Sequence, residues 1–411
     1  MFRKFLDRYF KDLPSEVAAL TGVSFSVALG FGIVAPVIPV FATTFDVSAL
    51  QASAVISVFA FMRFASATPS GWLVNKFGER AVLWVGLSIV AVSSALAGLS
   101  QSYEQLLVLR GLGGTGSSMF TVSAMSLLLR SVDPQHRGRA SSTYQSGFLL
   151  GGLAGPAVGG VVVAFSIRAP FFVYALTLTM AALVAYFALP KGLGRPEKQG
   201  EEIPSEPHMA LSSALKLREY WTAVSYNLGA GVTTFGLRNA LLPLFVIQVL
   251  HKSATTSSIG FLITSIAQAI FLLPAGRLTD IRGRKPAMSI GITFMAIAMT
   301  LIVVSESLLS YCLYMAFIGV GMSFLSAGAA AVIGDIVANR KGGPVVAFYQ
   351  MTSDFGMIVG PLLAGYLRDF TGGYQAPFVM SLVIVLIVAG FIVTMPETKS
   401  RQYAHQPSTT T

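Results

Sequence analysis

Long apolar runs alternate with short polar segments along nearly the whole chain. A helix needs about 20 apolar residues to cross the hydrocarbon core of a membrane, and these runs reach that length. We expect twelve membrane-spanning helices, near residues 17–42, 51–74, 80–100, 104–130, 139–165, 169–190, 219–249, 257–279, 285–305, 308–337, 343–367 and 374–395. The pattern predicts an all-α polytopic membrane protein built from a six-helix half over 17–190 and a second over 219–396.

The polar segments predict how the chain lies in the membrane. Residues 1–16 have an amphipathic pattern typical of an interfacial helix, whereas 191–218 form a polar linker and 397–411 a polar tail. All but six of the 28 Lys and Arg lie on the side of the membrane that carries the termini and the linker. By the positive-inside rule that side is the cytoplasm. This distribution explains the net charge of +10 without nucleic acid.

Composition excludes several other kinds of protein. Only 11% of residues are charged, against about 25% in soluble domains. The lone cysteine, Cys312, excludes an internal disulfide and a cysteine metal cluster, and the four histidines have no ligand spacing. We expect no metal site and no enzymatic activity, since no nucleophile–base spacing is evident.

A repeat divides the chain into two homologous halves. Residues 144–160 read YQSGFLLGGLAGPAVGG and residues 349–365 read YQMTSDFGMIVGPLLAG, so matching positions differ by 205. Glycines four residues apart lie on one helix face, and small residues let membrane helices approach closely. We therefore expect a helix-packing motif at Gly151, Gly155, Pro156, Gly159, Gly160, Gly360 and Pro361.

A loop motif recurs at the same offset. GWLVNKFGERAVL begins at Gly71 and GRLTDIRGRKPAM begins at Gly276. The second copy resembles the signature between spans two and three of the major facilitator superfamily, G-x-L-x-D-x-x-G-R-K, whereas the first has Asn75 at the Asp position. The resemblance implies a fold of two pseudo-symmetric six-helix halves and a conformational latch at Gly71, Asn75, Gly78, Arg80, Gly276, Asp280, Gly283, Arg284 and Lys285. Because Asn75 carries no charge, we expect the latch of the first half to be weaker, although Asn75 can still cap a helix.

Three further motifs resemble, in turn, a first-span motif of the twelve-span drug:proton antiporters, the fourth-span motif of the superfamily and the fifth-span signature of its antiporters. They are LGFGIVAPVIP from Leu29, LRGLGGTG around Arg110, and the Gly-Pro motif of residues 151–160. The family resemblance implies that Arg110 takes part in proton coupling. The spelling GxGxxG at 111–116 is not a dinucleotide site, since it lacks the preceding strand that such a site needs.

Ionisable residues inside a membrane span are expensive and mark functional sites. Asp354 lies about 16 Å into its expected span at 1.5 Å per residue, and Arg63 lies at similar depth from the other face. In the fold of this superfamily the two spans are neighbours. We therefore expect Arg63 and Asp354 to pair and to separate when Asp354 binds a proton; a static structural ion pair is the alternative.

Other polar residues in the spans form the expected substrate cavity: Arg238, Asn239, Gln145, Tyr144, Gln268, Gln350 and Tyr349. For the tyrosines, packing in the helix bundle is the alternative role. The span interior carries more Arg than Asp, and the first span has no carboxylate. This charge balance favours neutral, zwitterionic or anionic amphiphiles, including lipids, over strictly cationic drugs.

These observations predict a proton-coupled exporter of small amphipathic compounds such as drugs, associated with multidrug efflux and antibiotic resistance. We expect it as a monomer in a bacterial cytoplasmic membrane, surrounded by membrane lipid, with the proton gradient as energy source and no cofactor. The alternatives are a lipid or glycolipid flippase of the same fold and a proton-coupled sugar or metabolite symporter. A receptor would leave the doubled loop motif unexplained.

Overall fold

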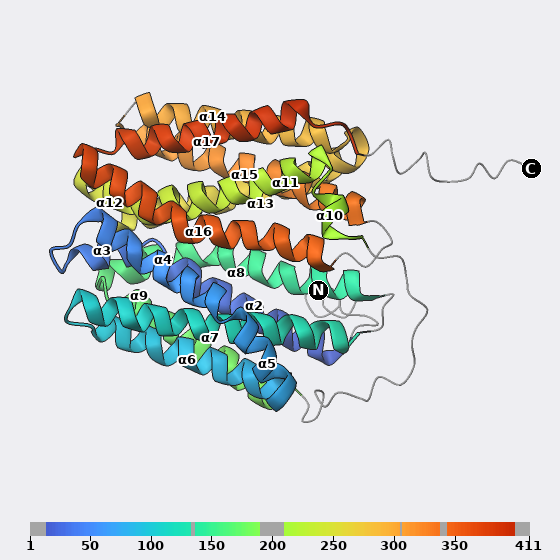
Figure 1. The fold of residues 1–411 in the computed structure, drawn as a ribbon. Helices are drawn as coiled ribbons and strands as arrows, with labels where there is room; N and C mark the ends of the chain where they lie inside the picture. Colours follow the sequence, from blue (N-terminus) through green and yellow to red (C-terminus); the bar gives the residue numbers. More distant parts are fainter. Residues whose placement is uncertain (1–13, 133–135, 190–208, 305, 338–342, 399–411) are drawn as a thin grey trace, which may run out of the picture. The chain divides into compact units, whose positions relative to one another are not determined.

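The computed structural model describes residues 14–132, 136–189, 209–304, 306–337 and 343–398. Most of the expected interfacial helix (residues 1–13), of the linker (190–208) and of the tail (399–411) lies outside them. Every regular element of the described part is helical (Figure 1). The elements are α2 Ser15–Val34, α3 Ile38–Thr43, α4 Ala49–Ala65, α5 Ala67–Phe77, α6 Glu79–Leu99, α7 Tyr103–Arg130, α8 Arg137–Phe165, α9 Ala169–Ala188, α10 Leu211–Ala214, α11 Arg218–Ala230, the π-helix η2 Gly231–Leu241, α12 Leu242–Gln248, α13 Ala254–Arg282, α14 Arg284–Val304, α15 Leu308–Val337, α16 Gly343–Thr371 and α17 Gln375–Thr394.

The predicted all-α membrane fold is confirmed. Within the described residues, ten helical segments are long and apolar enough to cross a membrane, and the bent pair α4 and α5 makes an eleventh if it is one span. The remaining expected run, near 343–367, is helix α16. It is long enough to span but less apolar than the others, because residues 349–354 of its middle are mostly polar.

Proline breaks two of the expected spans. Helix α4 ends at Ala65 and α5 continues at an angle of 47°. Pro69 lies four residues after Ala65, where its ring would clash with the Ala65 carbonyl of a continuous helix. The first expected run likewise divides into α2 and α3 around Pro36.

The chain forms two compact units. Unit 1 comprises Met1–Val47, Ala54–Gly200 and Ala254–Ile259, and unit 2 comprises Ser48–Ser53, Glu201–Ser253 and Gly260–Thr411. The expected halves are contiguous in sequence, but each unit includes a short segment from the other half. The first turn of α4 belongs to unit 2, and the first residues of α13 belong to unit 1.

Each unit is packed around close helix pairs. In unit 1, α2 packs on α8 and α9, and α6 packs on α7 and α9 (Figure 1). In unit 2, α14 packs on α15 and α17, and α16 packs on η2 and α11. The surface carries many large apolar side chains, of which Phe165, Phe187, Leu273 and Phe370 are more than 70% exposed. So much exposed apolar surface is untypical of a soluble protein and suits contact with lipid.

Candidate functional site

The glycine motif brings α8 against α2 inside unit 1. A Cβ atom added to Gly155 would lie 2.7 Å from Gly32 Cα, and one added to Gly151 would lie 2.3 Å from the Phe25 carbonyl oxygen. Gly159 faces Ile33 in the same way, and a Cβ on Gly160 would reach the Ser258 side chain at 3.5 Å. The two backbones are therefore in direct contact, as small residues permit in membranes.

The second copy of the glycine motif brings α16 against η2 inside unit 2. A Cβ added to Gly360 would lie 2.6 Å from Val232 Cα in η2, and α16 also carries Pro361 in its interior. By contrast, Gly71 and Gly276 of the loop motif have nothing within 4 Å of an added Cβ.

Arg110 is buried in unit 1. It lies on α7 with 3% of its surface exposed, and its guanidinium carbon stands 4.4 Å from the centre of the Phe59 ring. Its Nε atom is buried without a hydrogen-bond partner in the described structure. The ring supplies a cation–π contact, but aromatic carbon does not replace an oxygen acceptor.

Arg238 lies in the π-helix of unit 2. Its Nε donates to Asn239 Oδ1 at 3.2 Å, its Nη1 lies 3.7 Å from Met322 Sδ, and its guanidinium carbon stands 5.2 Å from the centre of the Phe261 ring. Long π-helices are rare and occur often at functional sites. Two of the expected cavity residues, Arg238 and the buried Asn239, are therefore joined by a side-chain hydrogen bond.

Arg63 and Asp354 lie in different units. Arg63 is near the end of α4 in unit 1, and Asp354 is near the middle of α16 in unit 2. Both side chains are half-buried. Their pairing stays a prediction.

The other expected cavity residues divide into packed and exposed groups. Tyr144 is buried in unit 1 with its ring 5.3 Å from that of Phe148, so it is a packing residue of the bundle. Gln145 and Gln350 are exposed, while Gln268 and Tyr349 are half-buried. The backbone carbonyls of Gln268 and Tyr349 accept hydrogen bonds from Ser323 and Asn227.

The loop motif of unit 2 has an ion pair at its centre. Arg284 donates to both carboxylate oxygens of Asp335, at 2.7 and 2.9 Å, and Thr398 donates to the same carboxylate at 2.6 Å. Both charged side chains are at least nine-tenths buried. Asp335 is not one of the expected latch residues, yet it is the ion-pair partner of Arg284. Asp280 is exposed.

Helix α14 begins on a carboxylate cap. Glu397 accepts hydrogen bonds from the backbone N–H groups of Arg284 at 2.9 Å and Lys285 at 3.0 Å. Gly283 precedes them at φ 109°, where an added Cβ would lie 2.6 Å from the Glu397 carboxylate. The Lys285 amine donates to the Val393 carbonyl at 2.6 Å.

The loop motif of unit 1 has an ion pair with the opposite polarity. Glu79 is fully buried and accepts hydrogen bonds from Arg130 at 2.6 Å and Ser126 at 3.0 Å. Arg80 donates to the Tyr186 carbonyl and lies over its ring. Asn75 is exposed inside α5, and α6 begins after Gly78, so the possible capping role of Asn75 is wrong for α6.

The two ion pairs occupy equivalent positions. Adding 205 to Glu79 gives Arg284, and adding 205 to Arg130 gives Asp335. Sequence reasoning missed both pairs, although the repeat offset contained the signal. The partners Arg130 and Asp335 lie outside the two loop motifs, at the ends of the helices that face them.

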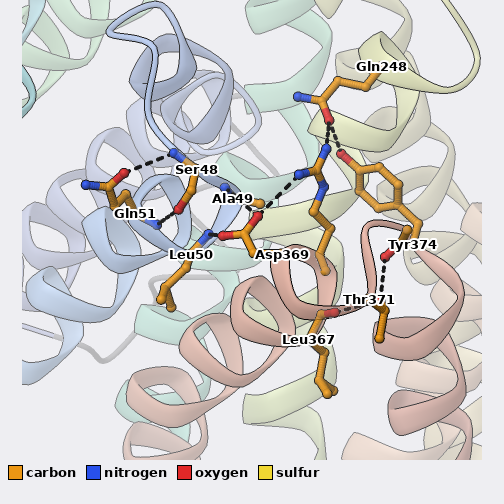
Figure 2. A network of polar contacts seen from close by, with 11 residues as sticks. Ser48, Ala49, Leu50, Gln51, Gln248, Leu367, Asp369, Thr371 and Tyr374 are labelled. Atoms are coloured by element: carbon orange, nitrogen blue, oxygen red, sulfur yellow. Dashed lines mark hydrogen bonds and ion pairs between the residues drawn. The ribbon is translucent and has the colours of Figure 1, made fainter.

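A polar network at the end of α16 was also missed (Figure 2). Asp369 accepts hydrogen bonds from the backbone N–H groups of Ala49 at 3.1 Å and Leu50 at 2.8 Å, the first turn of α4. Arg368 donates to Asp369 at 3.2 Å and to Gln248 at 2.9 Å, and the Tyr374 hydroxyl donates to Gln248 at 2.6 Å. All these groups belong to unit 2.

Asp369 therefore acts as a cap from another helix. It follows the expected end of its span at residue 367. Burial acts to raise its pKa, but hydrogen bonds from Leu50, Ser48, Ala49 and Arg368 outweigh burial and lower the pKa from its ordinary value of 3.8. The carboxylate stabilises the positive end of α4.

Within the described residues, no group of three or more His, Cys, Asp or Glu side chains could hold a metal ion.

A family model described as Major Facilitator Superfamily matches residues 20–251 and 227–410. An uncharacterised MFS-type transporter of Methanocaldococcus jannaschii is 24% identical over 91% of this chain and 97% of its own. Multidrug resistance protein 2 of Bacillus subtilis is 24% identical over 90% of this chain and 93% of its own, and quinolone resistance protein NorA of Staphylococcus aureus is 23% identical over 92% and 95%.

Solved structures show the same fold. A bacterial homologue of the human lysosomal transporter Spinster, in an inward-facing and unoccupied conformation, superposes with a TM-score of 0.73. The two are 14% identical, and the match covers 97% of this chain and all of the other.

Proposed function

We propose that this chain, which belongs to the major facilitator superfamily, exports small amphipathic compounds in exchange for protons. The observation that carries the proposal is similarity over about nine-tenths of both chains to a multidrug resistance protein and a quinolone resistance protein. Both are bacterial, which also supports placement in a bacterial cytoplasmic membrane. The arrangement of Lys and Arg in the sequence supports cytoplasmic termini.

Proton coupling is assigned to Asp354, since it is the carboxylate expected nearest the membrane midplane. A proton taken up there neutralises a charge that is costly in the membrane. Arg63 is the proposed ion-pair partner of Asp354 in its charged form, and Arg110 supports the coupling from unit 1. The two units then expose the substrate site alternately to each side of the membrane, as in other transporters with repeated halves.

The test is proton movement in proteoliposomes that enclose a pH-sensitive dye under an imposed pH gradient. Wild type, Asp354→Asn and the control Asp46→Asn are each exposed to a panel of amphipathic drugs and lipids. Asp46 is an exposed carboxylate between α3 and α4, so its variant matches the charge change. We expect compound-triggered proton flux in wild type and Asp46→Asn and none in Asp354→Asn.

Flux that survives in Asp354→Asn would move the proton site elsewhere, and Asp335 is then the next carboxylate to substitute. Movement of lipid or solute without proton flux would contradict antiport and identify a flippase or facilitator. Protons and solute moving in the same direction would identify a symporter.

A further inference from the structure

The expected spans carry more positive than negative charge. They contain Arg63, Arg110 and Arg238 but one mid-span carboxylate, Asp354. Glu79 and Asp335 lie at helix ends and are already paired with Arg130 and Arg284. A charged group in a medium of low polarity needs a counter-charge or strong hydrogen bonds. One mid-span carboxylate therefore cannot neutralise all three arginines.

Arg238 is the arginine best placed to receive an anion from outside the chain. A guanidinium has five N–H donors, and in the described structure one contacts an oxygen, that of Asn239, while another faces the sulfur of Met322. The ring of Phe261 covers one face of the group. Arg238 also keeps partial exposure, whereas Arg110 is 3% exposed and stacked on Phe59.

A second unsatisfied donor lies near Arg238. The Tyr314 side chain is fully buried, and its hydroxyl has no hydrogen-bond partner among the described residues. Tyr314 lies within electrostatic range of Arg238. Leaving a buried donor unpaired costs about 1–3 kcal/mol. A guanidinium and a hydroxyl together suit an acceptor-rich group.

We infer that Arg238, oriented by Asn239 and assisted by Tyr314, binds an oxyanion group, carboxylate or phosphate, of the transported amphiphile. The inference rests on the proposed function, since it names the chemical class of its substrate. Two N–H groups of Arg238 bind two oxygens of the anion in a charge-assisted pair. The apolar part of the amphiphile lies against the aromatic and aliphatic side chains of the spans.

The test compares probes with the same tail and different head groups. Lauric acid, lauramide and lauryl trimethylammonium are titrated at neutral pH into the full-length protein in lipid nanodiscs. The variants are wild type, Arg238→Gln, Arg238→Lys and Arg282→Gln, the last removing an exposed arginine from the end of α13. We expect wild type and Arg282→Gln to bind laurate about tenfold more tightly than lauramide, the typical worth of a charge-assisted hydrogen bond.

Arg238→Gln should lose this preference while its lauramide affinity stays unchanged. Arg238→Lys should retain part of it, because an ammonium is a point charge that cannot bind two oxygens in parallel. Tyr314→Phe, which removes one unpartnered hydroxyl, should weaken laurate binding several-fold and tests the site if Arg238→Gln does not fold. Equal affinity of wild type for laurate and lauramide would overturn the inference.

Two controls separate the sources of the anion and the two proposals. If inorganic phosphate displaces laurate at similar affinity, the site binds a free anion, and the inference that the anion belongs to an amphiphile is overturned. Compound-driven proton flux that is unchanged in Arg238→Gln, for laurate as well as for the cationic probe, would leave antiport standing and reject this inference. Arg238-dependent laurate binding without any proton flux would support this inference and contradict antiport.

Discussion

A carboxylate–arginine pair holds the loop motif in each unit, with the charges exchanged; the pair in unit 2 is buried, whereas Arg130 in unit 1 is half-exposed. Glu79 pairs with Arg130 in unit 1, and Arg284 pairs with Asp335 in unit 2, at positions related by the repeat. The attraction between the partners does not depend on which helix carries the cation. What matters is that both charges are present, since removing one partner of a buried pair typically costs about 3–5 kcal/mol.

A charge exchange in unit 1 tests this equivalence. Glu79→Arg should lower thermal stability, because it places two cations together at a buried position. The double variant Glu79→Arg with Arg130→Asp copies the arrangement of unit 2 and should recover most of the loss. The recovery will be partial, because Arg130 is half-exposed and its pair is weaker than a fully buried one.

The measurement is a double-mutant cycle of melting temperatures in detergent. Glu79→Arg with Lys76→Asp has the same net charge but puts the new carboxylate on an exposed position of α5, and it should not recover the lost stability. Additive effects of Glu79→Arg and Arg130→Asp would contradict a direct pair.

Asp369 predicts a pH-dependent stability of unit 2. Its pKa is lowered in the folded protein, so its contribution is complete above the ordinary value of 3.8 and is lost as the pH falls through that value toward the lowered one. Asp369→Ala should reduce stability by about 1 kcal/mol near neutral pH, the usual worth of a helix cap.

The difference between wild type and Asp369→Ala should shrink as thermal unfolding is measured at pH values below 3.8. Asp46→Asn, which removes the charge of an exposed carboxylate and keeps a residue type that tolerates its backbone φ of 55°, serves as the control and should show no comparable cost at neutral pH. A stability difference that is constant with pH would mean that the charge of Asp369 is not what holds α4.

Among the elements, α8 shows how sequence spacing sets a helix contact. Gly155→Ala should destabilise the protein by about 1–3 kcal/mol, the usual cost of overpacking, because the new Cβ would lie 2.7 Å from the α2 backbone. Gly152→Ala on the same helix meets nothing within 4 Å. It should be neutral or stabilising, by up to about 1 kcal/mol, since Ala is the better helix former.

Thermal unfolding of the two variants in the same detergent checks the sign of each effect. Equal destabilisation by both would show that helix propensity or membrane insertion, and not the contact with α2, decides the outcome.

The helices themselves were largely predictable, because an apolar run of sufficient length has few alternatives in a membrane. The breaks within these helices were not predictable. The runs 51–74 and 219–249 are continuously apolar enough to be taken as one helix each, yet the first bends before Pro69 and the second contains η2. Within the π-helix, Gly231 and Gly236 meet the backbone of α16, a tertiary contact that hydropathy does not encode.

At the scale of the whole molecule, the repeat made the two halves and their loop motifs predictable from sequence. The partners of those motifs were less accessible, since Glu79 and Arg130, or Arg284 and Asp335, are about 50 residues apart and meet only when helices pack. The capping role of Asp369 was harder still to predict, because its partners are backbone N–H groups more than 300 residues away. Such groups carry no sequence signature.

The exchange of short segments between the units sets an order on biosynthesis. Unit 1 includes Ala254–Ile259, so it lacks part of its structure until the ribosome has passed the linker and made the start of α13. Unit 2 needs Ser48–Ser53, which leave the ribosome early and must wait for Asp369 near the end of the chain. Unit 1 can therefore be completed only after the start of α13 has been made, whereas unit 2 can be completed only after the last spans are inserted.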